Sequence, residues 1–141
     1  MNNSTFELLV KSKNSNAVKA YYTSDKADVT TKAKDCASKG FPVVVISREN
    51  GTKKAAVSGP KADWNQFRRI VEVTFGGKDD CYTYVCDSLW EVGDSRFVQT
   101  PKGVKMAVVK TAAHMVHVSA VMAKEAEIGY SLKQFEKAVI K

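Results

Sequence analysis

The run of apolar residues from Phe41 to Ser47 restricts the fold of this 141-residue chain more than any other feature of the sequence. Its centre, Val43-Val44-Val45-Ile46, is uninterrupted and β-branched, which is typical of a strand buried on both faces of a sheet. Asn50-Gly51 follows it closely, and both residues tolerate the positive φ angles of a tight hairpin turn. The sequence therefore predicts a central strand that turns at Asn50-Gly51 and returns as a neighbouring strand over Lys53–Ser58.

Upstream of this hairpin, the pattern predicts two further strands and one helix. Phe6–Val10 and Ala17–Thr23 are separated by the polar turn Asn14-Ser15-Asn16, which indicates another hairpin. After Ser24, the expected N-cap, apolar residues at helical spacing form a narrow stripe, and Gly40 ends the helix. The stripe consists of Val29, Ala33, Cys36 and Ala37. The first part of the chain thus has the expected order β-β-α-β-β.

The segment that follows the Asn50-Gly51 hairpin permits two interpretations. Pro60 suits the first turn of a helix, and the large apolar residues after it recur at helical spacing. These residues are Trp64, Phe67 and Val71. Ile70–Phe75, however, alternates like a strand before Gly76-Gly77 interrupts the pattern. We expect a helix through about Glu72, with a strand over Ile70–Phe75 as the alternative.

Downstream of Gly76-Gly77 the pattern changes to short strands joined by tight turns. The expected strands are Tyr82–Cys86, Arg96–Gln99, Val104–Lys110 and a further one over His114–Val118. Val92-Gly93-Asp94 and Pro101-Lys102-Gly103 are the expected turns. Closely spaced strands of this kind curl into a small barrel, and an amphipathic helix from the N-cap Ser131 to Val139 closes the chain.

The order of these motifs over residues 78–130 resembles small SH3-like barrels of the primosomal-helicase-like kind, which occur in phage and bacterial nucleic-acid proteins. The matching positions are Tyr82-x-Tyr84, Val92-Gly93-Asp94, Val98, Pro101, Gly103-Val104, Val108-Val109 and Ile128-Gly129-Tyr130. The chain as a whole resembles phage-encoded early proteins. We therefore expect an α+β protein in which residues 1–75 form a sheet-and-helix domain and residues 78–141 form an SH3-like β-barrel with a closing helix.

Positive charge is concentrated in the first half of the chain. The sequence has 22 Lys and Arg against 15 Asp and Glu, a net charge of +7. Residues 1–75 hold 13 of these basic residues against 7 acidic ones, whereas residues 76–141 hold 9 against 8. Such an uneven distribution is typical of proteins that neutralise the phosphates of a nucleic acid. Lysines that keep the protein soluble are the competing interpretation.

Basic residues flank the predicted hairpin turn. Arg48, Lys53 and Lys54 would project together from one end of the sheet, where they can contact adjacent phosphates. The other candidate phosphate-binding residues are Lys11, Lys13, Lys61, Arg68 and Arg69. An edge hairpin protected from aggregation by lysine is the alternative interpretation.

Exposed aromatic rings would add base stacking, which is worth about 1–3 kcal/mol per base. The candidates are Tyr21, Tyr22, Tyr82, Tyr84 and Trp90. The period of a strand places Tyr82 and Tyr84 on one face, whereas Tyr21 and Tyr22 point to opposite faces. Packing in the core is the alternative role for Tyr82 and Tyr84.

Common catalytic and metal-binding motifs are missing from the sequence. It has no G-x-G-x-x-G, no Walker-type loop and no G-x-S-x-G. His114 and His117 are three residues apart, and two strand residues at that spacing point to opposite faces, which argues against a metal site. Cys36, Cys81 and Cys86 lack C-x-x-C spacing, which favours free thiols. We expect no enzyme activity, no metal and no cofactor.

These observations predict a cytoplasmic protein, because the apolar runs are too short to span a membrane and the N-terminus lacks a signal sequence. The expected partner is a nucleic acid, DNA rather than RNA, with single-stranded DNA included. The alternative function is a protein-interaction module that modulates a host transcription or replication enzyme. An exposed apolar surface around Trp90 and Phe97 would favour this alternative. Open strand edges also allow a homo-oligomer.

Overall fold

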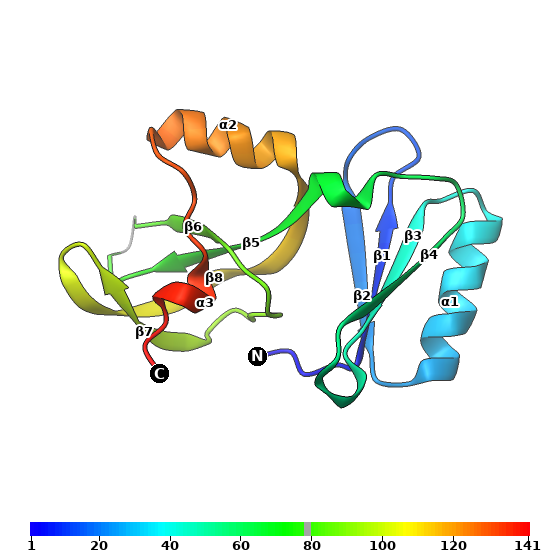
Figure 1. Ribbon diagram of the computed structural model, residues 1–141, viewed down its shortest axis with the longest axis horizontal. Helices are drawn as coiled ribbons and strands as arrows, with labels where there is room; N and C mark the ends of the chain where they lie inside the picture. Colours follow the sequence, from blue (N-terminus) through cyan, green and yellow to red (C-terminus); the bar gives the residue numbers. More distant parts are fainter. Residues whose placement is uncertain (78–79) are drawn as a thin grey trace. The chain divides into compact units, whose positions relative to one another are not determined.

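The structure, a computed structural model, describes residues 1–77 and 80–141 and contains two compact units (Figure 1). Asn3–Asn65 forms one unit, and Gln66–Lys141 together with Met1–Asn2 forms the other. Each unit contains a four-stranded antiparallel sheet, and the expected α+β class is confirmed. The boundary expected at Gly76-Gly77 lies inside the second unit, because the strand before these glycines pairs with strands after them. Residues 78–79, where the second expected domain begins, lie outside the described residues.

The sheet of Asn3–Asn65 has the strand order β2-β1-β3-β4. Its elements are β1 (Phe6–Lys11), β2 (Val18–Thr23), α1 (Lys26–Ser38), β3 (Val43–Ser47), a 3-10 turn (Glu49–Gly51) and β4 (Lys54–Ser58). The predicted central strand is confirmed, because β3 lies between β1 and β4 and its neighbouring residues Val43 and Val44 are both buried. The predicted turn is confirmed by φ angles of 53° at Asn50 and 71° at Gly51.

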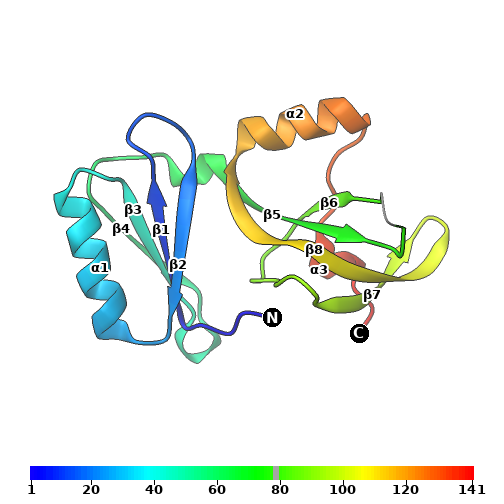
Figure 2. The same cartoon turned by 180° about the vertical axis from the view of Figure 1, so that it is seen from behind.

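Helix α1 lies alongside one face of this sheet (Figures 1 and 2). Val29 and Ala33 of its apolar stripe are buried against strand residues that share that face. These strand residues are Phe6, Leu8 and Val43. The N-cap is Asp25 and not the expected Ser24: the Asp25 carboxylate accepts hydrogen bonds from the backbone N–H groups of Ala27 and Asp28 at 3.0 and 3.3 Å. Helix α1 ends at Ser38, and Gly40 follows its C-cap with φ of 89°, so the predicted end of the helix is confirmed.

The helix expected through Glu72 is wrong. Only a 3-10 turn occurs, at Trp64–Gln66, and it is followed directly by β5 (Phe67–Thr74). Every second residue of β5 is buried: Phe67, Arg69, Val71 and Val73. The two-residue period of a strand therefore decides the structure here, and the helical spacing of the large apolar residues does not.

The sheet of the second unit has the order β6-β5-β8-β7, so β6 and β7 are its edges and the sheet is not closed. Besides β5, the elements are β6 (Tyr82–Val85), β7 (Ser95–Thr100), β8 (Gly103–His117), α2 (Val118–Ile128) and α3 (Phe135–Ala138). A separate strand over His114–Val118 was expected, but β8 continues through His117 as one strand. Helix α2 was not expected, and the final helix begins later than Ser131 and has Gln134 as its N-cap.

Strand β8 is bent because it contains more residues than the strand that it pairs with. Between the pairs Ile70–His114 and Val73–Val109 the register with β5 shifts twice, each time with an extra residue in β8. Extra residues of this kind bend a strand and increase its twist. Figure 2 shows β8 curving from the start of α2 towards its hairpin with β7. That hairpin closes at Gly103, where φ is 105°.

Trp90 and Phe135 are central to the core of the second unit. Both rings are buried and meet edge to face, with their centroids 5.1 Å apart. The valines of the sheet that pack with them are Val71, Val73, Val98 and Val109. Burying two large rings together adds a favourable ring–ring contact to the hydrophobic gain. The position of α3 is therefore fixed by Phe135.

We predict that replacing Arg48 with alanine lowers the free energy of unfolding by about 3 kcal/mol, because it removes an ion-pair partner of a buried carboxylate. The side chain of Glu7 is fully buried, and its Oε1 atom lies 3.2 Å from the guanidinium of Arg48. Urea unfolding followed by circular dichroism measures the change. The control, Glu7→Leu combined with Arg48→Met, should recover most of the loss. An Arg48→Ala variant as stable as the wild type would contradict the prediction.

Candidate functional site

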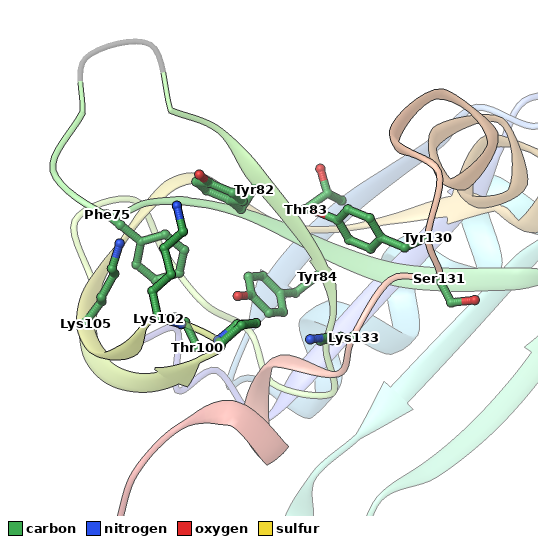
Figure 3. Close-up of a pocket in the computed structure, with 11 residues that line it drawn as sticks. Phe75, Tyr82, Thr83, Tyr84, Thr100, Lys102, Lys105, Tyr130, Ser131 and Lys133 are labelled. Atoms are coloured by element: carbon green, nitrogen blue, oxygen red, sulfur yellow. The ribbon is translucent and has the colours of Figure 1, made fainter.

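A groove of about 580 Å³ lies in the second unit, where β6, the β7–β8 turn and the segment after α2 come together (Figure 3). The described residues that line it are aromatic, basic and small polar ones. They are Phe75, Tyr82, Thr83, Tyr84, Thr100, Pro101, Lys102, Lys105, Tyr130, Ser131 and Lys133. A volume of this size accommodates a ligand as large as a nucleotide.

Three tyrosine rings and one phenylalanine ring form the apolar wall of the groove. Tyr82 rests on Phe75, with ring centroids 5.1 Å apart, and Tyr84 rests on the buried Phe135 at 5.3 Å. These contacts hold both tyrosines in place before any ligand binds. Tyr82 is nevertheless 40% exposed and Tyr130 is 54% exposed. The groove therefore offers open aromatic surface that is already positioned.

Three lysines supply the charge of the groove, and its described lining includes no carboxylate. Lys102 and Lys105 come from the β7–β8 hairpin, while Lys133 comes from the segment between α2 and α3 (Figure 3). In the part of the chain that the structure describes, none of these lysines forms an ion pair. All three ammonium groups are thus available to an anionic ligand.

The hairpin turn that carries Lys102 is closed by Thr100. Its hydroxyl donates a hydrogen bond to the carbonyl of Gly103 at 2.7 Å and accepts one from the backbone N–H of Lys102 at 3.2 Å. Both bonds are local, so the turn keeps its shape without help from a distant side chain. Lys102 therefore projects from a defined position at the rim of the groove.

Three backbone contacts hold the segment that carries Tyr130 and Lys133. Gly129 ends α2 in the left-handed conformation, with φ of 83°, and its N–H donates a hydrogen bond to the backbone carbonyl of Glu125. The carboxylate of Glu125 also accepts a bond from the N–H of Leu132 at 2.8 Å. The carbonyl of Lys133 accepts a bond from the N–H of Val85 in β6 at 3.0 Å. The segment between α2 and α3, which forms one wall of the groove, is thus hydrogen-bonded to β6, which forms another.

Burial raises the pKa of Tyr84 above its usual value of 10.0, and the neighbouring Tyr130 and Tyr82 raise it further. The phenol of Tyr84 therefore stays protonated at neutral pH. It is a neutral hydrogen-bond donor inside a groove whose rim is cationic.

Cys81 lies directly before Tyr82 and has an exposed side chain. Its thiol donates a hydrogen bond to the Glu72 carboxylate at 3.4 Å, and that carboxylate also accepts one from Thr111 at 2.9 Å. Partial burial raises the pKa of the Cys81 thiol, and the bond to Glu72 adds to the effect. The thiol therefore remains protonated at neutral pH.

Within residues 1–77 and 80–141, no three metal-ligating side chains come together. The two histidines of the H-x-x-H spacing have other partners. Nδ1 of His114 lies 2.8 Å from the carbonyl of Ala112, and Nδ1 of His117 accepts from the backbone N–H of Ser119 as the N-cap of α2. None of the three cysteines, all of which lie in the described part of the chain, forms a disulfide, as the spacing indicated.

The basic residues predicted around the Asn50-Gly51 turn have different surroundings. Lys53 and Lys54 are exposed at the start of β4. The guanidinium of Arg48 instead binds the buried carboxylate of Glu7. Lys11 donates to the carbonyl of Ser12, and the ammonium of Lys13 lies over the ring of Phe41, 4.7 Å from its centroid. These residues do not form one shared cluster of free cations.

The remaining predicted basic residues are also dispersed. Lys61 is exposed in the loop after β4. Arg68 and Arg69 are neighbours in β5 and point to opposite faces of the strand. Arg68 is exposed and donates to the carbonyl of Phe67, whereas Arg69 is buried with only 6% of its surface exposed. Burial makes Arg69 unsuitable as a phosphate contact.

The four predicted tyrosines divide into two pairs. Tyr82 and Tyr84 both line the groove. Tyr21 and Tyr22 lie on β2, in the other unit. The hydroxyl of Tyr21 donates to Asp28 at 2.8 Å, and the ammonium of Lys32 lies over its ring. The hydrogen bond to Asp28 is the main cause that raises the pKa of Tyr21. Its phenol and ring therefore serve contacts between β2 and α1.

Most residues of the groove were not identified from the sequence. The missed residues are Phe75, Thr83, Thr100, Pro101, Lys102, Lys105, Tyr130, Ser131 and Lys133. The Pro101-Lys102-Gly103 turn was predicted, and an exposed basic turn close to a tyrosine strand was a usable signal. The spacing of Tyr130 and Lys133 gives no such signal, because only the tertiary structure brings them to β6.

We predict that the stability of the protein falls as the pH rises above about 10, because the folded state favours the neutral phenol of Tyr84 and the unfolded state does not. The pKa is raised by folding, so this contribution is complete below pH 10 and is lost as the pH rises through the folded value. Tyr84→Phe should reduce the slope of stability against pH in this range. The measurement is the urea midpoint at several pH values, and an unchanged slope would contradict the role of burial.

In the described part of the chain, no helix is long and apolar enough to cross a membrane. Comparison with models of protein families, with curated proteins and with solved structures finds no match to this chain. The groove and its residues are therefore the basis for inferring a function.

Proposed function

We propose that this protein is a non-enzymatic nucleic-acid-binding protein and that the groove of the second unit is its binding site. One observation carries the proposal: open tyrosine rings line the same groove as three lysines that have no ion-pair partner among the described residues. Nucleic acids present flat aromatic bases and regularly spaced phosphates, and a site for them needs both kinds of side chain.

The two kinds of side chain have separate tasks in this proposal. The rings of Tyr82 and Tyr130 stack on bases, which tolerates every base because each has a flat π-face. Lys102, Lys105 and Lys133 contact the phosphates, and their affinity arises from the release of counterions. Tyr84 packs against Phe135, and its neutral phenol is available to donate a hydrogen bond to the bound nucleic acid.

Charge elsewhere in the chain supports the proposal. Residues 3–65 contain 11 Lys and Arg against 6 Asp and Glu. This surplus attracts a polyanion without reading its sequence and speeds association. DNA is the proposed partner. The likeness of residues 78–130 to SH3-like barrels of nucleic-acid proteins belongs to the same proposal, with the difference that this sheet is open at β6 and β7.

The alternative function, docking to a protein, has one supporting observation. Trp90 is buried, but Phe97 is 55% exposed and is paired across the β7–β8 hairpin with the exposed Met106. Val104 also lies on this face. The groove favours nucleic acid over this alternative, because a protein partner does not require three lysines beside open aromatic rings.

We predict that Lys102→Glu combined with Lys105→Glu weakens binding to DNA by at least about tenfold. The negative slope of log K against log salt should become shallower by about 2, because two phosphate contacts are lost. Fluorescence anisotropy of a labelled oligonucleotide over a series of salt concentrations measures both quantities.

The matched control for this pair is Lys53→Glu combined with Lys54→Glu. It changes the net charge by the same amount at the hairpin of the other unit. It should leave the salt slope nearly unchanged, since the proposed site loses no contact. Equal effects of the two double variants would show that only net charge matters. Absence of binding at low salt would contradict the proposal and favour the apolar face around Phe97.

We also predict that Tyr82→Ala and Tyr130→Ala each cost about 1–3 kcal/mol of binding free energy, while Tyr82→Phe and Tyr130→Phe retain most of the affinity. A stacking role needs the ring and not the hydroxyl. Anisotropy titrations measure the affinities, and circular dichroism checks that each variant is folded. Equal losses in the alanine and phenylalanine variants would rule out stacking.

A further inference from the structure

The outer edge of β6 has a short open stretch that faces the groove. β6 is an edge strand, and the N–H of Val85 points away from β5, because it donates to the carbonyl of Lys133. Backbone groups of alternate residues in a strand point to the same side. The N–H and C=O of Thr83 therefore also point outward, and Thr83 lines the groove.

Thr83 presents three polar groups that no described residue uses. Its outward N–H and C=O form no hydrogen bond with any described residue. Its hydroxyl oxygen is buried and has no partner among the described residues either. A buried hydroxyl without a partner is unfavourable, and the few that persist in folded proteins require an explanation. An outward donor and acceptor thus lie side by side at one residue that lines the aromatic groove.

The open stretch is too short to pair with an additional strand. The bridge between Val85 and Gln134 already covers the end of β6, so Thr83 is the one residue of this strand with free outward groups. Recognition of a peptide by strand addition requires a row of such groups. A single adjacent donor and acceptor instead match the Watson–Crick edge of a nucleobase, where a donor and an acceptor lie side by side.

We propose that the groove holds one unpaired base, whose Watson–Crick edge bonds to the N–H and C=O of Thr83. This inference rests on the proposed nucleic-acid function and specifies single strands as its substrate class. The rings of Tyr82 and Tyr130 stack against the base or its neighbour, and Lys102 and Lys105 bind the flanking phosphates. A duplex cannot bind in this way, because its Watson–Crick edges are already paired.

The test compares labelled oligonucleotides of one length that differ only in the base. Oligothymidylate should bind, and the same chain with N3-methylthymine should bind at least about tenfold more weakly, because the methyl group blocks the donor of the Watson–Crick edge. Oligodeoxyuridylate is the matched control. It lacks the methyl group at C5, far from that edge, and should bind within about twofold of oligothymidylate. A duplex of the same length should bind at least about tenfold more weakly than the single strand.

A protein variant gives an independent readout. Thr83→Pro removes the outward N–H of this edge strand, so it should weaken binding of oligothymidylate at least about tenfold. Thr83→Val is the matched control: it keeps the backbone N–H and C=O and should bind within about twofold of the wild type. The melting temperature of each free variant checks that it is folded. A folded Thr83→Pro variant with unchanged affinity would overturn the assignment of Thr83.

The outcomes separate this inference from the function on which it rests. Equal binding of thymine and N3-methylthymine chains, or of duplex and single strand, would overturn the inference and leave nucleic-acid binding intact. No binding of any oligonucleotide would overturn both.

Discussion

The antiparallel pairing of β5 with β8 is the interaction on which the unit of Gln66–Lys141 depends. β5 lies between β8 and β6, so it holds the tyrosine-bearing edge strand on one side and the long bent strand on the other. β8 begins at the turn that carries Lys102 and continues through Lys105 to the N-cap of α2. One end of this strand therefore supplies two of the groove's lysines, Lys102 and Lys105, and the other end leads into the helix that precedes Tyr130.

The sequence predicts structure well where local signals agree with each other. At β3 and its turn, the β-branched run and the Asn50-Gly51 dipeptide both indicate a hairpin, and the structure has one. At β5 the signals conflict, because helical spacing and strand alternation overlap. Pairing with β8 and β6 then makes the segment a strand, and the sequence of the segment alone does not show that these partners exist.

Helix α2 shows a different limit of sequence interpretation. Its interior is rich in alanine and glutamate, which favour a helix, but its N-cap is His117, a residue not typical of that position. The preceding residues belong to a strand, so no break in the pattern marks the start of the helix. Ser131 was expected to cap the last helix because serine is a common N-cap, yet the cap there is Gln134.

The same limit applies to the candidate site. Tyr82 and Tyr84 were identified because the strand period places them on one face, and they line the groove. The charges were harder to interpret, because a sequence does not show which partner a charged side chain will find. Arg48 pairs with Glu7, which lies 41 positions earlier, and Arg69 is buried. The three lysines of the groove come instead from the half of the chain with little net charge.

The surroundings of Cys81, the residue before Tyr82, have a chemical consequence for its thiol. Thiolates react with peroxides and disulfides, whereas protonated thiols do so slowly. Because its contact with Glu72 and partial burial keep Cys81 in the thiol form, the position is accessible to oxidants but poorly reactive. Accessibility and nucleophilicity are thus uncoupled at this residue, because burial and Glu72 outweigh the opposite effect of Lys110 and Lys124 on the pKa of the thiol.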